Sequence, residues 1–210
     1  MPLTLSSVTP TDRLFRSMNP VLEAIKTRRS AVNIKTEAVP EKNDVIKILE
    51  AGTWAPNHHL TEPWRFVVIA GEERKRLGEA MAAFVKRNTT NSQESSLDPK
   101  IALERAKPLR APVIIAVVCS PRKIGNNADV QEEIVACGAA LQNMLLAAQS
   151  LGLATMIKTG SSSYSDEVRD LLKMSKNELL IALVYLGYAE KVPESSRRAP
   201  VETKIEWRGL

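Results

Sequence analysis

The feature that most constrains this chain is a long helical segment that begins at Asp129 and runs to about Ser150. Between Ile134 and Ala148 the segment is apolar on nearly every face and rich in Ala, so it has no broad polar side to turn toward water. Polar residues such as Gln142 interrupt it too often for a bilayer span. A helix of this kind must be covered on all sides, and in a small chain a dimer interface is one way to do so. An ordinary central helix of a monomer is the alternative, and both stay open here.

Apolar runs predict the strands of one sheet. Residues 64–70 and 113–119 are almost continuously apolar, which is typical of buried strands. Shorter apolar runs cover residues 153–157 and 179–186. Helical segments separate these runs, and no internal repeat or mid-chain linker interrupts them. We therefore expect an α/β or α+β fold in one domain.

Local signals place the first helices and the domain boundary. Asn19-Pro20 predicts a helix start, since Asn caps helices and Pro fits their first turn. Three apolar residues are expected to face inward from this helix, namely Val21, Leu22 and Ile25. The next helix is expected to end at Gly52, because glycine favours the position after a helix. Residues 1–18 are polar and read as a flexible arm, which leaves residues 19–210 as the single domain.

Composition narrows the function classes. The chain has 9 Gly among 210 residues and contains neither G-x-G-x-x-G nor G-x-x-x-x-G-K-[ST], so the common glycine-rich nucleotide-binding loops are absent. A bound phosphate would then need Arg and Lys side chains or a helix N-terminus. The net charge of +5 comes from dispersed clusters, one of them Arg105/Lys107/Arg110, without interleaved aromatic residues. This pattern favours a small anionic ligand, and a non-enzymatic protein that binds nucleic acid or another anionic partner is kept as an alternative.

Side chains for direct catalysis are sparse. Cys119 and Cys137 lie in apolar surroundings and are expected to be buried free thiols. His58 and His59 are adjacent and would point to opposite sides of an extended segment, so no metal site is expected. The first residues lack the features of a signal peptide, so a cytoplasmic protein without a membrane partner is expected. With so few general catalysts, a bound cofactor that performs the chemistry becomes attractive.

Two short segments are ambiguous when each is taken alone. Arg28-Arg29-Ser30 closes the first predicted helix, where cations pair favourably with a helix C-terminus. The same residues could also clamp a phosphate through guanidinium and hydroxyl donors. Ala55-Pro56-Asn57-His58 is equally ambiguous, because Pro and Asn are common turn residues.

In their order along the chain, however, these segments resemble a known family. Arg28-Arg29-Ser30 and Ala55-Pro56-Asn57-His58 are followed by Glu62-Pro63-Trp64, the helix at 136–148 and Leu151-Gly152-Leu153. This order and spacing are similar to the FMN-dependent nitroreductase family, and the Ala-Pro-Asn-His loop is similar to its shorter, YdjA-like branch. The resemblance covers roughly residues 19–206.

The resemblance implies a fold, an assembly and a set of cofactor-binding residues. The implied fold is α+β in α/β/α layers, with a central mixed, mainly antiparallel sheet flanked by helices, in an intertwined homodimer with FMN at its interface. Arg28, Arg29 and Ser30 would hold the FMN phosphate and ribityl oxygens, and Arg198 would also reach the phosphate. Trp54 and His58 would reach FMN from the partner chain. The segment that would lie along the flavin is Ile157, Lys158, Thr159 and Gly160.

The implied activity is transfer of hydride from NADH or NADPH, through flavin N5, to a nitroaromatic, quinone or related acceptor by a ping-pong mechanism. No side chain is then expected as a catalytic residue, and the acceptor would lie against the segment around residues 86–107. A flavin enzyme of the same fold with an oxidative or dehalogenating reaction is the alternative. Val32 stands where the family often has a cation near the flavin, and Arg29 and Lys158 are the candidates to replace it.

Overall fold

The fold is built around one five-stranded sheet. The computed structural model describes residues 19–89, 97–122, 129–191 and 197–209. Four strands follow the order β1-β5-β3-β2, and β4 pairs with the same side of β5 as β1 does. The strands are β1 (Ile34–Lys35), β2 (Trp64–Ala70), β3 (Val113–Cys119), β4 (Ala154–Lys158) and β5 (Leu179–Ala189).

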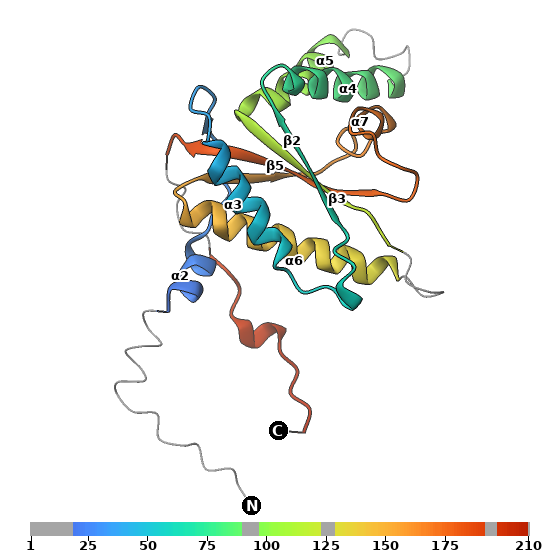
Figure 1. Cartoon of the computed structure of the whole chain (residues 1–210). Coiled ribbons are helices and arrows are strands. Elements are labelled where there is room, and N and C mark those ends of the chain that lie inside the picture. Colours follow the sequence, from blue (N-terminus) through green and yellow to red (C-terminus); the bar gives the residue numbers. More distant parts are fainter. Residues whose placement is uncertain (1–18, 90–96, 123–128, 192–196, 210) are drawn as a thin grey trace, which may run out of the picture.

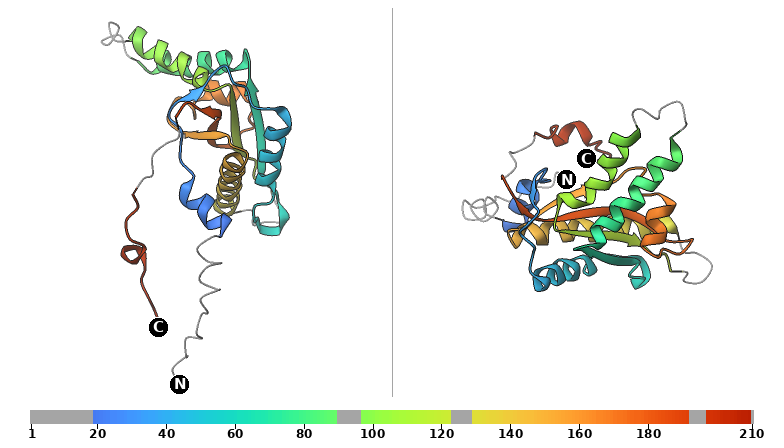
Figure 2. Two further views of the ribbon diagram at one scale, coloured as in Figure 1. Left: turned by 90° about the vertical axis from the view of Figure 1, so that its left-hand side faces the viewer. Right: turned by 90° about the horizontal axis from the view of Figure 1, so that it is seen from above.

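Helices cover both faces of this sheet (Figures 1 and 2). The α-helices are α2 (Pro20–Thr27), α3 (Lys42–Thr53), α4 (Glu73–Asn88), α5 (Leu97–Ala106), α6 (Val130–Ser150) and α7 (Asp166–Leu171). Short 3₁₀ helices are η1 (His58–Leu60), η3 (Lys107–Arg110) and η4 (Val201–Lys204). Helices α3 and α6 pack on one face, while α4 and α7 pack on the other, with α5 against α4. No helix among the described residues is long and apolar enough to cross a membrane.

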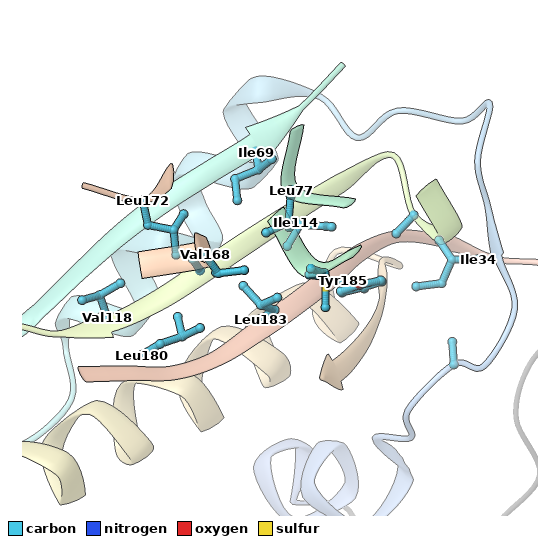
Figure 3. Close-up of a cluster of buried hydrophobic side chains, with 14 residues drawn as sticks. Ile34, Ile69, Leu77, Ile114, Val118, Val168, Leu172, Leu180, Leu183 and Tyr185 are labelled. Atoms are coloured by element: carbon cyan, nitrogen blue, oxygen red, sulfur yellow. The ribbon is translucent and has the colours of Figure 1, made fainter. Parts of the chain in front are cut away.

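The alternation of strand β3 divides the core into two clusters. All seven of its residues are buried. Ile114, Ala116 and Val118 face the cluster that contains Leu77 of α4 and Val168 of α7, which Figure 3 shows in close-up. The alternate residues, Val113, Ile115 and Val117, face the cluster formed with α3 and α6. A sheet covered on both faces explains why this strand is apolar at every position, and the α+β fold in layers is confirmed.

The sheet is antiparallel except for one isolated parallel bridge among the described residues. Every pairing between the named strands is antiparallel. A single parallel bridge joins Ser30 to Thr155, and the amide of Ala31 donates to the carbonyl of Thr155 at 3.0 Å. This bridge holds the segment after α2 against β4, and it therefore fixes the position of Arg28 and Arg29 relative to the sheet.

Two local predictions, the burial of β2 and the helix end at Gly52, are wrong because each depends on the elements that pack nearby. Strand β2 lies at an edge of the sheet, and most of its side chains are half-buried, so it is not the buried strand that its apolar run suggested. Gly52 lies inside α3, which continues to Thr53. A Cβ at Gly52 would lie 2.9 Å from Met144 Cγ, so this glycine lets α3 approach α6.

Within one chain, the apolar surfaces of α2 and α6 are not fully covered. Val21, Leu22 and Ile25 are 61%, 49% and 49% exposed, so the prediction that they face inward is wrong for the single chain. Helix α6 buries a stripe that includes Ala140 and Met144, but it leaves other apolar residues exposed, among them Val130, Ile134 and Val135. The predicted free thiols Cys119 and Cys137 are both buried.

Candidate functional site

The end of helix α2 places the first arginines. The Asn19 side chain caps the helix, accepting from the amides of Val21 and Leu22 at 3.0 and 3.2 Å. The helix ends at Thr27, and Arg28 already has an extended backbone, with ψ at 127°. The chain then runs extended to the bridge at Ser30, so Arg28 and Arg29 project from a short segment held at both ends.

Three guanidinium groups gather at this segment. Partial burial lowers the pKa of Arg28, and the nearby positive charges of Arg29 and Arg198 lower it further. Arg29 Nη1 donates to the carbonyls of Lys26 and Arg28, both at 2.7 Å. Its Nε is buried and has no hydrogen-bond partner within the part of the chain that the structure describes. A group of like charges with an unsatisfied donor favours binding of an anion.

A cavity of about 310 Å³ lies beside the end of strand β4. Residues 158–163 form one wall, and apolar side chains of α4, including Met81 and Phe84, form another. Gly160 has φ of +138°, a backbone conformation that L side chains rarely adopt. Apart from its two chain neighbours, no heavy atom of the described residues lies within 4 Å of the position that a Cβ would take there, so the backbone at Gly160 is open to a flat ligand.

Charged and hydroxyl groups also line this cavity. Lys107 Nζ forms an ion pair with Glu104 Oε1, and Ser162 Oγ donates to Glu104 Oε2 at 2.8 Å. Burial raises the pKa of Tyr185, which also lines the cavity, while the positive charge of Arg110 acts in the opposite direction. The cavity is therefore apolar on one side and charged on another, as sites for small molecules usually are.

The predicted partner-side residues lie away from this cavity in the single chain. Trp54 is 80% exposed and lines a shallow apolar groove with Val21 and Leu146. His58 is exposed and lines a separate groove at the start of α6. The His58 loop is fixed by Asn57, whose Oδ1 accepts from the amide of Glu62 at 2.9 Å. Within one chain, then, neither Trp54 nor His58 joins the residues at the end of β4.

Among the predicted flavin-side residues, Lys158, Thr159 and Gly160 all line the cavity. Ile157 precedes them on β4 and is 37% exposed. The parallel bridge between Ser30 and Thr155 places the arginine segment beside strand β4. Arg29 lines a hollow with Gly152, Leu153 and Ala154 at the start of this strand, whereas Lys158, Thr159 and Gly160 line the cavity at its end.

Comparison with known proteins identifies the family to which this chain belongs. The family model described as "Nitroreductase family" matches residues 25–188, which include strands β1 to β4 and all of β5 except its last residue. The chain belongs to the nitroreductase family. It is 31% identical over 184 residues to the Escherichia coli protein named "Putative NAD(P)H nitroreductase YdjA", covering 87% of this chain and 95% of that protein.

Solved structures of the nitroreductase family have the same fold. The structure of a nitroreductase-like family protein from Bacillus cereus aligns with a TM-score of 0.75 at 29% identity, covering 91% of this chain and 97% of that one. A Desulfovibrio desulfuricans structure described as "a putative nitroreductase in complex with fmn" aligns with a TM-score of 0.66 at 31% identity, covering 91% and 99%. The nitroreductase family predicted from the motifs is confirmed, and the 31% identity to YdjA agrees with the predicted branch resemblance.

Sequence reasoning missed several residues of this nitroreductase cavity. Glu104, Ser162 and Tyr185 were not singled out, and Lys107 and Arg110 appeared only within a dispersed basic cluster. Their positions in the sequence are separated by up to about 80 residues, with no shared motif. The one available signal was the two cations, Lys107 and Arg110, at the start of the run that leads into β3.

Proposed function

We propose that this nitroreductase binds FMN and transfers hydride from NADH or NADPH to nitroaromatic, quinone or related acceptors. The observation that carries the proposal is the pair Arg28 and Arg29 on a segment bridged to β4, with the positive charge of Arg198 near Arg28 and an open cavity at the end of that strand. A cofactor with an anionic tail and a flat ring fits this pair of features.

The residues present fit FMN on the properties of the structure itself. The buried, unpartnered Nε of Arg29 and the lowered pKa of Arg28 favour a bound anion, so these residues and Arg198 would hold the phosphate, with Ser30 beside them. The open backbone at Gly160 leaves room for the ring along the segment 157–160. When bound, FMN would accept a hydride from the nicotinamide and pass it to the acceptor.

The chain itself would contribute positioning and exclusion of water. Met81 and Phe84 line the cavity with apolar surface, which removes water from the ring and strengthens the electrostatic interactions made there. The flavin performs the chemistry, so no acid–base pair of side chains is required. Since one cavity would receive the nicotinamide and then the acceptor, we expect ping-pong kinetics.

A second copy of the chain would complete the site. Trp54 and His58 are exposed and lie outside the cavity of their own chain, so they would reach FMN bound to the partner. The relatively apolar groove beside Trp54 supports a homodimer as the active assembly.

Cofactor binding is the first test of this function. The purified protein should show flavin absorbance, or gain it when FMN is added, and should quench FMN fluorescence with a defined dissociation constant. Arg28→Gln is expected to weaken FMN binding at least tenfold, because a charged hydrogen bond contributes about 1.5–3 kcal/mol. Lys75→Gln, an exposed site on α4, is the matched charge control and should bind as the parent does. A parent protein that binds no FMN would overturn the proposal.

Steady-state kinetics tests the reaction. NADH or NADPH should reduce the bound FMN, and double-reciprocal plots at several acceptor concentrations should be parallel, as for a ping-pong mechanism. Reduction of FMN followed by turnover only with halogenated substrates would instead assign a dehalogenating reaction of the same fold. Intersecting lines would exclude the ping-pong mechanism while leaving the FMN assignment in place.

A further inference from the structure

The cavity beside β4 contains more positive charge than a neutral ring requires, and this inference rests on the proposed FMN function. Hydride transfer adds two electrons and one proton to oxidised FMN, and NADH or NADPH leaves as NAD⁺ or NADP⁺. The reduced flavin then carries a negative charge on the pyrimidine part of its ring. A cation placed in advance beside that part of the ring stabilises the reduced form more than the oxidised form.

Three cationic side chains line the cavity: Lys107, Arg110 and Lys158. Lys107 is the weakest candidate, because its ammonium is already paired with Glu104. The Glu104 carboxylate is held in turn by the hydroxyl of Ser162 at 2.8 Å. This ion pair is nearly neutral as a unit, so it contributes little net charge to the cavity.

Arg110 lies at the end of η3 and lines two adjoining hollows. One is the cavity beside residues 158–160, and the other is the hollow that Arg110 shares with residues 32–34 and with the acidic Glu190. Its side chain is therefore between the end of β4 and the chain that follows Ser30. No carboxylate of the described residues lies within ion-pair distance of its guanidinium, unlike that of Lys107.

Arg110 also has an electrostatic effect on Tyr185, a residue that lines the cavity. Its positive charge lowers the pKa of the buried Tyr185 against the larger, opposing effect of burial. A guanidinium that influences a phenol lining the cavity is close enough to influence a ring bound there. Val32, by contrast, is 73% exposed and carries no charge, so this position cannot supply the cation.

We propose that Arg110 supplies the positive charge that stabilises the reduced flavin. Lys158 lines the same cavity and is the competing candidate. Arg29 is less suited, because its Nη1 donates to two backbone carbonyls within the arginine cluster.

The reduction potential of the bound flavin tests this assignment without a turnover assay. For Arg110→Gln, we expect the affinity for reduced FMN to fall about tenfold more than that for oxidised FMN, which lowers the two-electron potential by about 30 mV. Arg110→Lys should recover most of the potential, and Lys158→Gln should lower it less than Arg110→Gln does. The surface control Lys75→Gln should leave the potential at the parent value. Redox-dye titration gives the potential, and fluorescence quenching gives the affinity for oxidised FMN.

The outcomes separate this inference from the function on which it rests. If the parent binds FMN and Arg110→Gln leaves the potential unchanged, the assignment of Arg110 is wrong while FMN binding stands. A drop confined to Lys158→Gln would assign the charge to Lys158 and also overturn the proposal. If the parent binds no FMN, the proposed function fails first. Thermal unfolding of Arg110→Gln should match the parent because the side chain is exposed, and Arg110→Lys provides the comparison if it does not.

Discussion

At the scale of single residues, Glu178 shows how a buried charge is stabilised. Arg65 donates from Nε and Nη2 to the two carboxylate oxygens of Glu178 at 2.7 and 3.0 Å. The amide of Ser175 donates to the same carboxylate at 2.8 Å. The Arg65 hydrogen bond is the largest cause that lowers the pKa of Glu178 to about 2, against the opposing effect of burial. This contact ties β2 to the turn before β5, far along the chain.

The depressed pKa of Glu178 predicts an acid dependence of stability. A pKa that falls from 4.5 to about 2 on folding stabilises the protein above pH 4.5, and this stabilisation is lost as the pH drops toward 2. Because Arg65 is about one-third exposed, we expect Glu178→Gln to cost about 2 kcal/mol at neutral pH. Urea unfolding from pH 7 to pH 2.5 should show the difference from the parent shrinking below pH 4.5.

The exposed Glu202→Gln is the control for that series, and it should leave the free energy of unfolding nearly unchanged at every pH. A difference between parent and Glu178→Gln that stayed constant down to pH 2.5 would contradict the assignment of the depressed pKa to Glu178.

At the scale of elements, Gly78 sets the distance between α4 and α5. A Cβ at Gly78 would lie 2.2 Å from the carbonyl oxygen of Arg105, which is backbone and cannot rotate away. Helix α4 also buries Leu77 and Met81 in the core cluster against the sheet, so α4 cannot move away from α5 without disturbing that packing. A close approach of this kind requires glycine, although glycine is otherwise unfavourable inside a helix.

We therefore expect Gly78→Ala to lower the free energy of unfolding by about 1–3 kcal/mol, the usual cost of overpacking. Helix propensity alone would have the opposite sign, since Ala is favoured over Gly by about 1 kcal/mol. Ala83→Gly, at an exposed position of the same helix, measures that propensity in place and should cost up to about 1 kcal/mol. Urea unfolding of both variants compares the two effects, and a more stable Gly78→Ala would show that the helices can move apart freely.

At the scale of the whole molecule, apolar surface left open by one chain points to a second copy. The groove lined by Val21, Trp54 and Leu146 joins α2, α3 and α6. The C-terminal segment from residue 197 runs away from the sheet and helices in both Figures 1 and 2, and Trp207 within it is 69% exposed. Surfaces of this kind usually belong to an interface.

We expect the protein to be a homodimer in solution and Leu22→Glu to shift it toward the monomer. A charge placed in the apolar surface of α2 would lose its water on association, which is costly without a partner. Leu103→Glu, on α5, is the control at a similarly exposed leucine and should stay dimeric. Light scattering after size exclusion measures the mass, with 23.1 kDa for one chain. A monomeric parent that still binds FMN would contradict the shared site.

Much of the fold could be predicted from the sequence, because periodicity reports local geometry. The fully apolar run of β3 and the helix at 130–150 appear where the pattern placed them. The prediction was wrong where burial depends on neighbours: β2 became an edge strand, and Gly52 became a close contact inside α3. The wrong prediction for α2 has the same cause. Its apolar pattern predicts that one face is buried, but the pattern does not show whether the same chain or a second copy covers that face.

For the site, the sequence by itself determined which short segments could bind a phosphate and lie along a flat ring. The resemblance already placed Arg198 with Arg28, but only the tertiary structure decided that Glu104 pairs with Lys107 and that Arg110, in the same cavity lining, has no ion-pair partner among the described residues. The physical reason is that electrostatic interactions depend on distance in space. Local patterns set the direction of each side chain within its element, whereas the packing of the elements sets which charges meet.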